Sequence, residues 1–358
     1  MRPVNVSDYE EVARQKLPQA AYDFIAGGAG DEVTLAANRS SLERMRLRPR
    51  VLVDVSNVSL ETQVLGQRLS WPVLLAPVAT QRLAHEAGEL ATARAAAARD
   101  TVMVLSSFST CSLEEVAQAA PGGPRWFQLY FQSDKQITKR LVQRAEAAGC
   151  SAICVTVDVP ELGLRERDLH NQLRFPPGVV PRNFIDDAGV TPYQATDPGT
   201  ASQNAGLLNP SLTWPDIDWL HSITSLPVLV KGVLTAEDAS IAVEHGVRGI
   251  IVSNHGGRQL DGVPAAIEAL PEVVAAVGDR ADVLMDSGIR RGTDVLKALA
   301  LGAQAVLIGR AYIWGLAAEG EDGVRRVIEM LRAELRLAMM LAGCPAIADI
   351  DRSLVCGP

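Results

Sequence analysis

The sequence predicts an α/β fold, an eight-stranded parallel (β/α)8 or TIM barrel, and three observations support this. The chain has 358 residues, 47% of them hydrophobic, so it can bury a large core. Short apolar runs recur along it, and each is followed by a longer segment with helical periodicity. Polar residues stand at the end of nearly every run, where such barrels place their functional groups.

The apolar runs are rich in Val, Ile and Leu, as is typical of parallel strands buried on both faces. Eight βα units in about 250 residues match a closed barrel. A doubly wound open sheet is the alternative, but it would need a Gly-rich turn after its first strand, and residues 77–85 contain no glycine. The predicted strands are residues 73–76, 101–105, 126–129, 152–157, 228–231, 248–252, 282–285 and 305–308.

Several helices between these strands carry local signals. Residues 86–98 are rich in alanine, a strong helix former. The sequence from Ser112 to Glu115 resembles a capping box, and residues 135–148 carry charges paired at i,i+4. These segments are predicted to form the helical layer outside the barrel.

Two segments exceed what a barrel needs within the single domain that we expect over residues 1–358. Residues 1–70 are predicted to form an N-terminal helical extension, with helices at 6–17 and 19–26. Residues 176–215 are rich in Gly, Pro, Asn, Asp and Ser. A long connection of this kind is more often a lid or binding loop than a disordered segment, which is the alternative.

Composition narrows the class of protein. A net charge of −8 without a basic cluster argues against nucleic acid as a partner. The five cysteines lack metal-ligand spacing and are expected to be reduced thiols, so no bound metal is expected. No signal-peptide pattern and no apolar run of about 20 residues is present, which predicts a cytoplasmic enzyme without a membrane partner.

The segment from Ser253 to Gly262 follows the apolar run 248–252 and reads Ser-Asn-His-Gly-Gly-Arg-Gln-Leu-Asp-Gly. His255 can move a proton near neutral pH, and Arg258 can bind a carboxylate through two parallel hydrogen bonds. The glycines let the backbone approach a ligand closely. This segment is therefore predicted to belong to an active site.

The last two strands end in Asp286-Ser-Gly-Ile-Arg290 and Gly309-Arg310. Barrels of this class commonly bind phosphate at these two strands. A surface salt bridge would explain either arginine alone. Together they favour a phosphorylated cofactor.

Six segments resemble the FMN-dependent α-hydroxy-acid oxidase and dehydrogenase family, which includes glycolate, lactate and hydroxymandelate oxidases. They are Leu-Ala-Pro (75–77), Trp-Phe-Gln-Leu-Tyr (126–130), Thr-Val-Asp (156–158), Leu-Val-Lys-Gly-Val (229–233), Val-Ser-Asn-His-Gly-Gly-Arg-Gln-Leu-Asp (252–261) and Gly-Ile-Arg-Arg-Gly-Thr-Asp (288–294). The resemblance extends from Tyr9 to Ser353.

The resemblance implies FMN as cofactor and the oxidation of an (S)-2-hydroxy acid to its 2-oxo acid. The reduced flavin would be reoxidised by O₂ to give H₂O₂, and the protein would be a homotetramer or homo-octamer. A quinone- or cytochrome-linked dehydrogenase and a monooxygenase of the same family are the alternatives. Two further alternatives are a phosphate-binding barrel similar to isopentenyl diphosphate isomerase and a non-catalytic flavin-binding scaffold. Neither would need His255 and Arg258 together.

The resemblance assigns the chemistry to five side chains. Arg165 and Arg258 would bind the substrate carboxylate, because a planar guanidinium fits a carboxylate better than an ammonium does. His255 would be the base, taking a proton either from Cα in a carbanion scheme or from the hydroxyl in a hydride scheme. Asp158 would stabilise the imidazolium, and Tyr130 would hydrogen-bond a substrate oxygen.

Several assignments implied by the resemblance have a structural alternative. Asp158 could cap a helix, Tyr130 could lie at the edge of the core, and Lys231 could extend to solvent. Arg165 could form a surface ion pair with a neighbouring acid, the candidates being Glu161, Glu166 and Asp168.

The cofactor residues implied by the resemblance come from all the strand ends. Lys231 would lie beside the N1–C2 edge of the flavin, where a cation favours the reduced anionic ring. The full predicted set is Pro77, Val78, Ala79, Ser106, Gln128, Thr156, Lys231, Ser253, Asp286, Ser287, Gly288, Arg290, Gly309 and Arg310.

Some residues depart from the family pattern. Phe24 replaces a common Tyr, Phe108 replaces a Trp, and Val78 replaces a Thr. With Leu162 they predict an apolar pocket for a longer aliphatic or aromatic substrate side chain. Ser287 replaces a usual Gly in the phosphate loop. The predicted substrate-binding set is Phe24, Phe108, Tyr130, Leu162, Arg165, His255 and Arg258.

Overall fold

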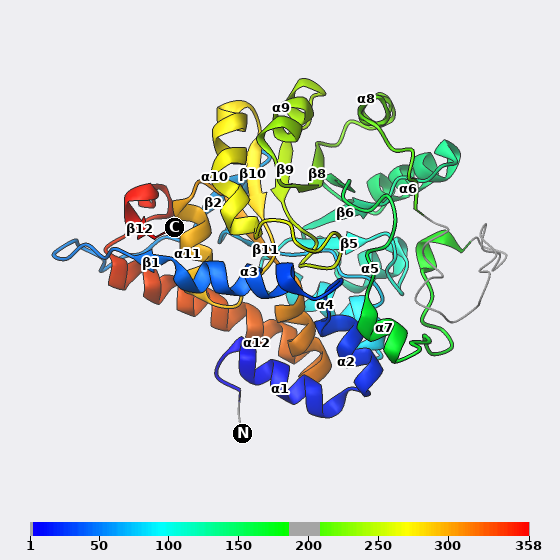
Figure 1. Ribbon diagram of the computed structural model, residues 1–358, viewed down its shortest axis with the longest axis horizontal. Helices are drawn as coiled ribbons and strands as arrows, with labels where there is room; N and C mark the ends of the chain where they lie inside the picture. The colour runs from blue at the N-terminus through cyan, green and yellow to red at the C-terminus, as the bar shows by residue number, and fades with distance from the viewer. Residues whose placement is uncertain (1–2, 186–207, 358) are drawn as a thin grey trace.

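The computed structural model describes residues 3–185 and 208–357, and eight parallel strands within them form a closed barrel with helices outside it (Figure 1). Strand order around the barrel is β10-β11-β4-β5-β6-β7-β8-β9, so neighbours in sequence are neighbours in space. The predicted barrel is confirmed. Its strands are β4 (Val73–Leu75), β5 (Met103–Ser106), β6 (Arg125–Leu129), β7 (Ile153–Thr156), β8 (Val228–Val233), β9 (Gly249–Val252), β10 (Asp282–Met285) and β11 (Ala305–Ile308).

The helices that follow the strands bury one face against the barrel. The capping box at Ser112 is confirmed, because its hydroxyl accepts from the Glu115 N–H at 3.2 Å. A kink at Glu319 and Gly320 divides the long helix α12. The bounds are α4 (Gly88–Ala97), α5 (Leu113–Ala119), α6 (Lys135–Ala147), α7 (Glu166–His170), α8 (Trp214–Ile223), α9 (Ala236–Glu244), α10 (Ala266–Val277), α11 (Gly292–Ala300) and α12 (Arg310–Ala342). Short 3₁₀ turns lie at Gln81–Leu83, Arg182–Phe184, Gly278–Arg280, Ile347–Asp349 and Arg352–Leu354.

The N-terminal extension begins with the two predicted helices, α1 (Val6–Lys16) and α2 (Gln19–Ala26). Asn5 starts α1 by accepting from the Asp8 N–H at 2.9 Å. Helix α1 packs along α12 on the outside of the barrel (Figure 1). A third helix, α3 (Val33–Arg44), and a short strand, β1 (Arg46–Leu47), which pairs with β12 (Val355–Cys356), were not predicted.

A hairpin of β2 (Thr62–Val64) and β3 (Gln67–Leu69) closes the N-terminal end of the barrel. Val64 and Leu69 are buried in the same cluster as the side chains inside the barrel, among them Trp126. The Leu65 N–H donates to the Asp282 carboxylate at 2.5 Å, which fixes the hairpin to the start of β10. One end of the barrel is therefore plugged, and the opposite end is left for a site.

The predicted lid, residues 176–215, lies largely outside the described residues. Its beginning is anchored, because the Asn183 side chain accepts from the Leu113 N–H at 2.9 Å and donates to Ser109 at 2.8 Å. Its last two residues belong to α8, which Thr213 caps together with Asp216. No helix in the described ranges has the length and apolar character needed to cross a lipid bilayer.

Candidate active site

Side chains from the ends of all eight strands line one cavity at the C-terminal end of the barrel. The carboxyl ends of parallel strands meet at one edge, so residues far apart in sequence converge there. The cavity has an empty volume of about 1320 Å³, which includes its part open to solvent. Each strand end contributes a lining residue, and in chain order these are Pro77, Ser106, Gln128, Thr156, Lys231, His255, Asp286 and Gly309.

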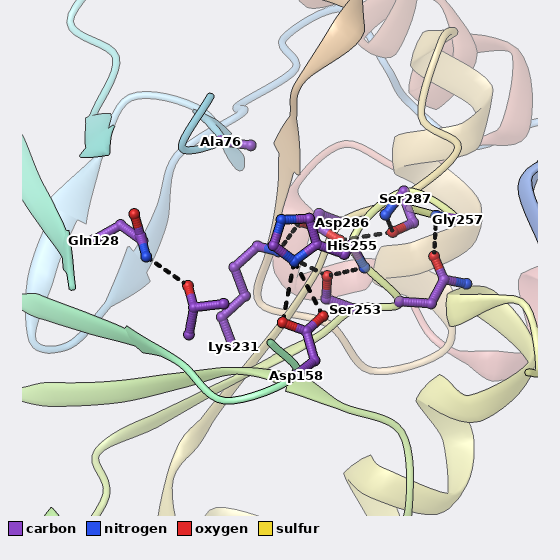
Figure 2. Close-up of polar contacts among 12 residues, drawn as sticks. Ala76, Gln128, Asp158, Lys231, Ser253, His255, Gly257, Asp286 and Ser287 are labelled. Carbon is purple, nitrogen blue, oxygen red and sulfur yellow. Dashed lines mark hydrogen bonds and ion pairs between the residues drawn. The ribbon is translucent and has the colours of Figure 1, made fainter. Parts of the chain in front are cut away.

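His255 and Asp158 form a hydrogen-bonded pair beside this cavity (Figure 2). The ring Nδ1 lies 3.1 and 3.2 Å from the two carboxylate oxygens. Burial lowers the pKa of His255, while the Asp158 charge partly opposes this. Burial raises the pKa of Asp158, but His255 outweighs it and the net pKa is lowered. The neutral imidazole therefore carries its proton on Nδ1, and Nε2 is the basic nitrogen.

The backbone that carries His255 is in the left-handed region for three residues in succession. The φ angles are 58° at His255, 66° at Gly256 and 74° at Gly257. Glycine is needed at the third position, because an added Cβ on Gly257 would lie 2.6 Å from the backbone N of Leu35. The His255 N–H donates to Ser253 Oγ at 3.0 Å. This turn bends the chain so that the imidazole reaches the cavity.

Lys231 is a buried cation at the end of β8. Its Nζ lies 3.0 Å from Asp286 Oδ2 and donates to Ser253 Oγ at 2.9 Å (Figure 2). Burial lowers the pKa of Lys231, but Asp286 and Asp158 outweigh burial and raise it above its usual value. The alternative that Lys231 extends to solvent is wrong, and a fixed positive charge stands in the cavity wall.

A row of polar side chains crosses the strands opposite. Ser106 donates to Gln128 Oε1 at 3.1 Å, and Gln128 donates to Thr156 Oγ1 at 2.8 Å. Tyr130 lines the cavity and stacks on Phe108, with ring centroids 4.6 Å apart. Burial raises the pKa of Tyr130 to about 12, so its hydroxyl stays protonated and can donate to a ligand.

Arg165 and Arg258 line the same part of the cavity. Arg258 donates to the carbonyls of Phe24 and Gly27 at 2.6 and 2.9 Å, and its guanidinium lies 5.0 Å from the centre of the Phe24 ring. Arg165 has a buried Nε without a hydrogen-bond partner in the described structure. Burial lowers the pKa of both, and the Arg165 charge lowers that of Arg258 further.

The proposed ion-pair alternative for Arg165 is wrong. No ion pair links its guanidinium to Glu161, Glu166 or Asp168, all of which the structure describes. The helix-cap alternative for Asp158 is also wrong, because the next helix, α7, begins at Glu166 after the N-cap residue Arg165. Both side chains are instead directed to the cavity or to His255.

A second pair of arginines lines the cavity at the ends of β10 and β11. Arg310 donates to the carbonyls of Ile25, Gly256 and Gly27 at 2.8, 2.9 and 2.7 Å. Burial lowers the pKa of Arg310 to about 9, and the charge of Arg290 adds to the effect. Neither arginine forms an ion pair with a carboxylate in the described residues, so the surface salt-bridge alternative is wrong.

The remaining predicted residues divide into lining and supporting groups. Asp158 and Ser253 do not line the cavity. Asp158 hydrogen-bonds the His255 ring, and Ser253 accepts from the His255 N–H and from Lys231. All the others line it, including the apolar residues Phe24, Val78, Phe108 and Leu162 and the loop residues Pro77, Ala79, Ser287 and Gly288.

Two residues that were not predicted make specific contacts in the site. Phe175 lines the cavity and packs edge-on against Phe24, with ring centroids 5.4 Å apart. Gln259 donates to the carbonyls of Asp158 and Glu161 at 3.0 and 2.9 Å, and accepts from the Gly163 N–H at 3.2 Å. Gln259 lies in the segment after His255, so its position beside Arg258 was the available signal; Phe175 had none.

Comparisons with known proteins agree with this geometry. Residues 13–357 match the family model described as FMN-dependent dehydrogenase. The chain is 53% identical to an L-lactate oxidase of Nostoc sp. strain PCC 7120, over 99% of this chain and 98% of the relative. It is also 53% identical to a glycolate oxidase of Spinacia oleracea, over 99% and 95% of the two chains.

Solved structures agree as well. A mandelate oxidase with 3,3-difluoro-2-hydroxy-3-phenylpropionic acid superposes with a TM-score of 0.89 at 45% identity, covering 99% of each chain. A mandelate oxidase with benzoyl-formic acid gives the same TM-score and identity, covering 99% of this chain and 98% of the other. The chain belongs to the FMN-dependent α-hydroxy-acid oxidase family.

Proposed function

We propose that this enzyme oxidises an (S)-2-hydroxy acid with an apolar side chain to the 2-oxo acid, using FMN and O₂. The substrate loses two electrons and two protons, one proton from Cα and one from the hydroxyl. The two electrons and two protons pass on to O₂, which becomes H₂O₂.

The main support for this proposal is the set of four largely buried arginines that line one cavity. Burial lowers the pKa of all four; the charge of Arg165 lowers the pKa of Arg258 further, and the charge of Arg290 lowers that of Arg310 further. A buried cation without a counter-ion is costly, and an anion that enters relieves that cost. Two pairs call for two anionic groups, and a carboxylate and a phosphate both match the guanidinium fork.

The residues fit FMN. Arg290 and Arg310, with the backbone N–H groups of residues 287–289, would hold the phosphate. The polar row of Ser106, Gln128 and Thr156 would meet the polar edge of the ring, and the Lys231 cation would favour the reduced form. FMN supplies the two-electron acceptor that no side chain provides.

Proton transfer falls to His255. Nδ1 donates to Asp158, so Nε2 accepts the proton, and Asp158 stabilises the imidazolium that results. Tyr130, protonated because of its raised pKa, would donate to the substrate oxygen. Arg165 and Arg258 would orient the carboxylate so that the Cα hydrogen and the hydroxyl lie within reach of His255.

The apolar lining supports the choice of substrate side chain. Phe24, Phe108, Leu162 and Phe175 surround the part of the cavity next to the two substrate arginines. Each buried CH₂ contributes about 0.8 kcal/mol, whereas a hydroxyl or second carboxylate would lie there unpaired. An aromatic or medium-chain 2-hydroxy acid should therefore be preferred to glycolate.

The test uses the purified holoenzyme. We expect one FMN per chain on denaturation and anaerobic bleaching of the flavin by (S)-mandelate or 2-hydroxyoctanoate faster than by lactate, and by lactate faster than by glycolate. H₂O₂ should form in proportion to O₂ consumed. A flavin that no 2-hydroxy acid bleaches would refute the reaction, and reoxidation by a quinone but not by O₂ would favour the dehydrogenase alternative.

Arg310→Ala tests the cofactor end separately. It should release FMN from the protein during gel filtration, because the phosphate loses a guanidinium partner. Arg44→Ala, whose side chain lies on the exposed face of α3, is the matched control and should retain FMN. Equal FMN retention in both variants would contradict the placement of the phosphate.

We also propose that the enzyme is a homotetramer or homo-octamer. Exposed apolar side chains gather where residues 51–53 meet the end of α12, among them Leu52, Leu337 and Leu341. Exposed apolar clusters of this kind are typical of subunit contacts. Light scattering coupled to gel filtration should give a mass of four or eight chains, and a monomer would contradict the proposal.

A further inference from the structure

Ser287 joins two parts of the site that are distant in sequence. Its hydroxyl accepts from the Gly256 N–H at 3.0 Å and donates to Asp286 Oδ1 at 2.8 Å (Figure 2). Gly256 directly follows His255, and Asp286 is the ion-pair partner of Lys231. One hydroxyl therefore connects the segment of His255 to the end of β10.

The contacts around His255 form a continuous set with Ser287 as one of its members. On one side, the His255 N–H donates to Ser253 Oγ, which also accepts from Lys231. On the other side, the next N–H, that of Gly256, donates to Ser287. Both hydroxyls are anchored to the same Lys231–Asp286 pair. His255 is thus held from both of its flanking peptides.

Ser287 occupies a conformation that a serine adopts at a cost. Its φ is 74°, in the left-handed region that glycine tolerates freely and other residues avoid by roughly 1–2 kcal/mol. The segment that it binds is also left-handed at His255. Backbone strain of this kind persists only where surrounding contacts hold it. The contact at this position is the hydrogen bond from Gly256.

We propose that Ser287 is a positioning residue whose hydroxyl fixes the left-handed His255–Gly256 turn to the segment that holds the FMN phosphate. The proposal rests on the role of His255 as base in the function proposed above. Because the hydroxyl is bonded to the Gly256 N–H and to Asp286, it should affect how well Nε2 is placed and leave carboxylate binding by Arg165 and Arg258 unchanged.

Two substitutions separate the hydroxyl from the backbone strain. Ser287→Ala removes the hydroxyl and keeps the Cβ at positive φ, whereas Ser287→Gly removes both. Ser41→Ala is the matched control, since it deletes a buried hydroxyl that donates to Glu268 at 2.6 Å between α3 and α10, away from the cavity.

The first measurement needs no turnover. Hydrogen exchange of the Gly256 amide is followed by NMR in the FMN-loaded protein of the parent and the three variants. Loss of a hydrogen bond of ordinary strength should speed exchange by about 3- to 10-fold in both Ser287 variants and leave Ser41→Ala at the parent rate. Unchanged exchange in both Ser287 variants would overturn the proposal.

The second measurement is flavin reduction in the FMN-loaded enzyme at saturating substrate. Both Ser287 variants should be slower by about 3- to 10-fold, while the Kd of a 2-oxo acid, which reports the carboxylate contacts, stays at the parent value. Thermal stability should diverge, with Ser287→Gly above Ser287→Ala because it relieves the positive φ.

The outcomes are distinguishable. Slow reduction in Ser287→Ala alone would assign the effect to strain and overturn the role of the hydroxyl. A matching loss of 2-oxo acid affinity would also overturn it. If the parent itself is not reduced by any 2-hydroxy acid, the proposed function fails, and the Gly256 exchange rates alone then decide whether the hydroxyl holds the turn.

Discussion

One end of the barrel is apolar, and the other is lined by charged side chains. At the N-terminal end the β2–β3 hairpin inserts Val64 and Leu69 into an apolar cluster. At the C-terminal end Lys231 and two arginine pairs line a cavity. Apolar burial stabilises the fold, and buried charge opposes it. Apolar burial at the N-terminal end offsets the free-energy cost of the buried charges at the C-terminal end. Substitutions at the N-terminal end should therefore change stability, and those at the C-terminal end should change catalysis.

The largest expected effect is on chemistry at the C-terminal end. His255→Ala should slow substrate-dependent flavin reduction by about 10²- to 10⁴-fold, the usual contribution of a general base. FMN content and the unfolding midpoint should stay at parent values, because Ser253 and Ser287 bind the backbone of this segment and not the imidazole. Stopped-flow reduction measures the rate, and a variant reduced as fast as the parent would remove His255 from its role.

Asp158→Asn tests the C-terminal end through the pH dependence of kcat/KM. The Asp158 charge raises the pKa of His255 against the lowering effect of burial. Removing the charge should lower that pKa, so the acidic limb of kcat/KM moves to lower pH. The plateau should fall by about 10²-fold, because the imidazolium loses its counter-ion. An acidic limb that moved to higher pH would contradict the pairing.

Leu69→Ala tests the plugged end. Truncating a buried leucine should lower the free energy of unfolding by about 2–4 kcal/mol. Flavin reduction in the folded holoenzyme should be unchanged, since Leu69 lies at the far end of the barrel from His255. Urea denaturation measures the free energy of unfolding, and stopped-flow kinetics on the same sample measures the rate of flavin reduction. Slower chemistry with unchanged stability would break the division between the two ends.

The smallest effect should come from Phe24→Tyr. The added hydroxyl lies beside Arg258, whose guanidinium covers the Phe24 ring, and it makes the pocket more polar and smaller. The ratio of kcat/KM for (S)-mandelate over glycolate should fall by about 3- to 10-fold. A panel of steady-state measurements gives the ratio. No change would show that the substrate side chain lies elsewhere.

The barrel and most of the site could be predicted from the sequence for a physical reason. Strands buried on both faces leave continuous apolar runs, and their carboxyl ends must meet at one edge. Placing His255, Lys231 and Arg310 after three such runs therefore places them together. The hairpin could not be predicted, because strands of three residues such as Thr62–Val64 are too short to show alternation.

Contacts that depend on side-chain direction were also beyond the sequence. Phe175 follows no strand, and only the course of the chain after α7 brings it against Phe24. Ser287 was noted as a departure from the family pattern, but its bond to Gly256 depends on two positive φ angles that the sequence did not specify. The lid prediction for residues 176–215 stays a prediction.

The arginine hydrogen bonds to residues 24–27 have a consequence for how the molecule is made. They join residues 231 to 285 positions apart, so these bonds to the end of α2 cannot form until Arg258 and Arg310 have been synthesised. Contacts with such sequence separation form late in folding. The cavity therefore forms only after these distant segments have come together. During refolding, flavin binding should recover later than helical structure.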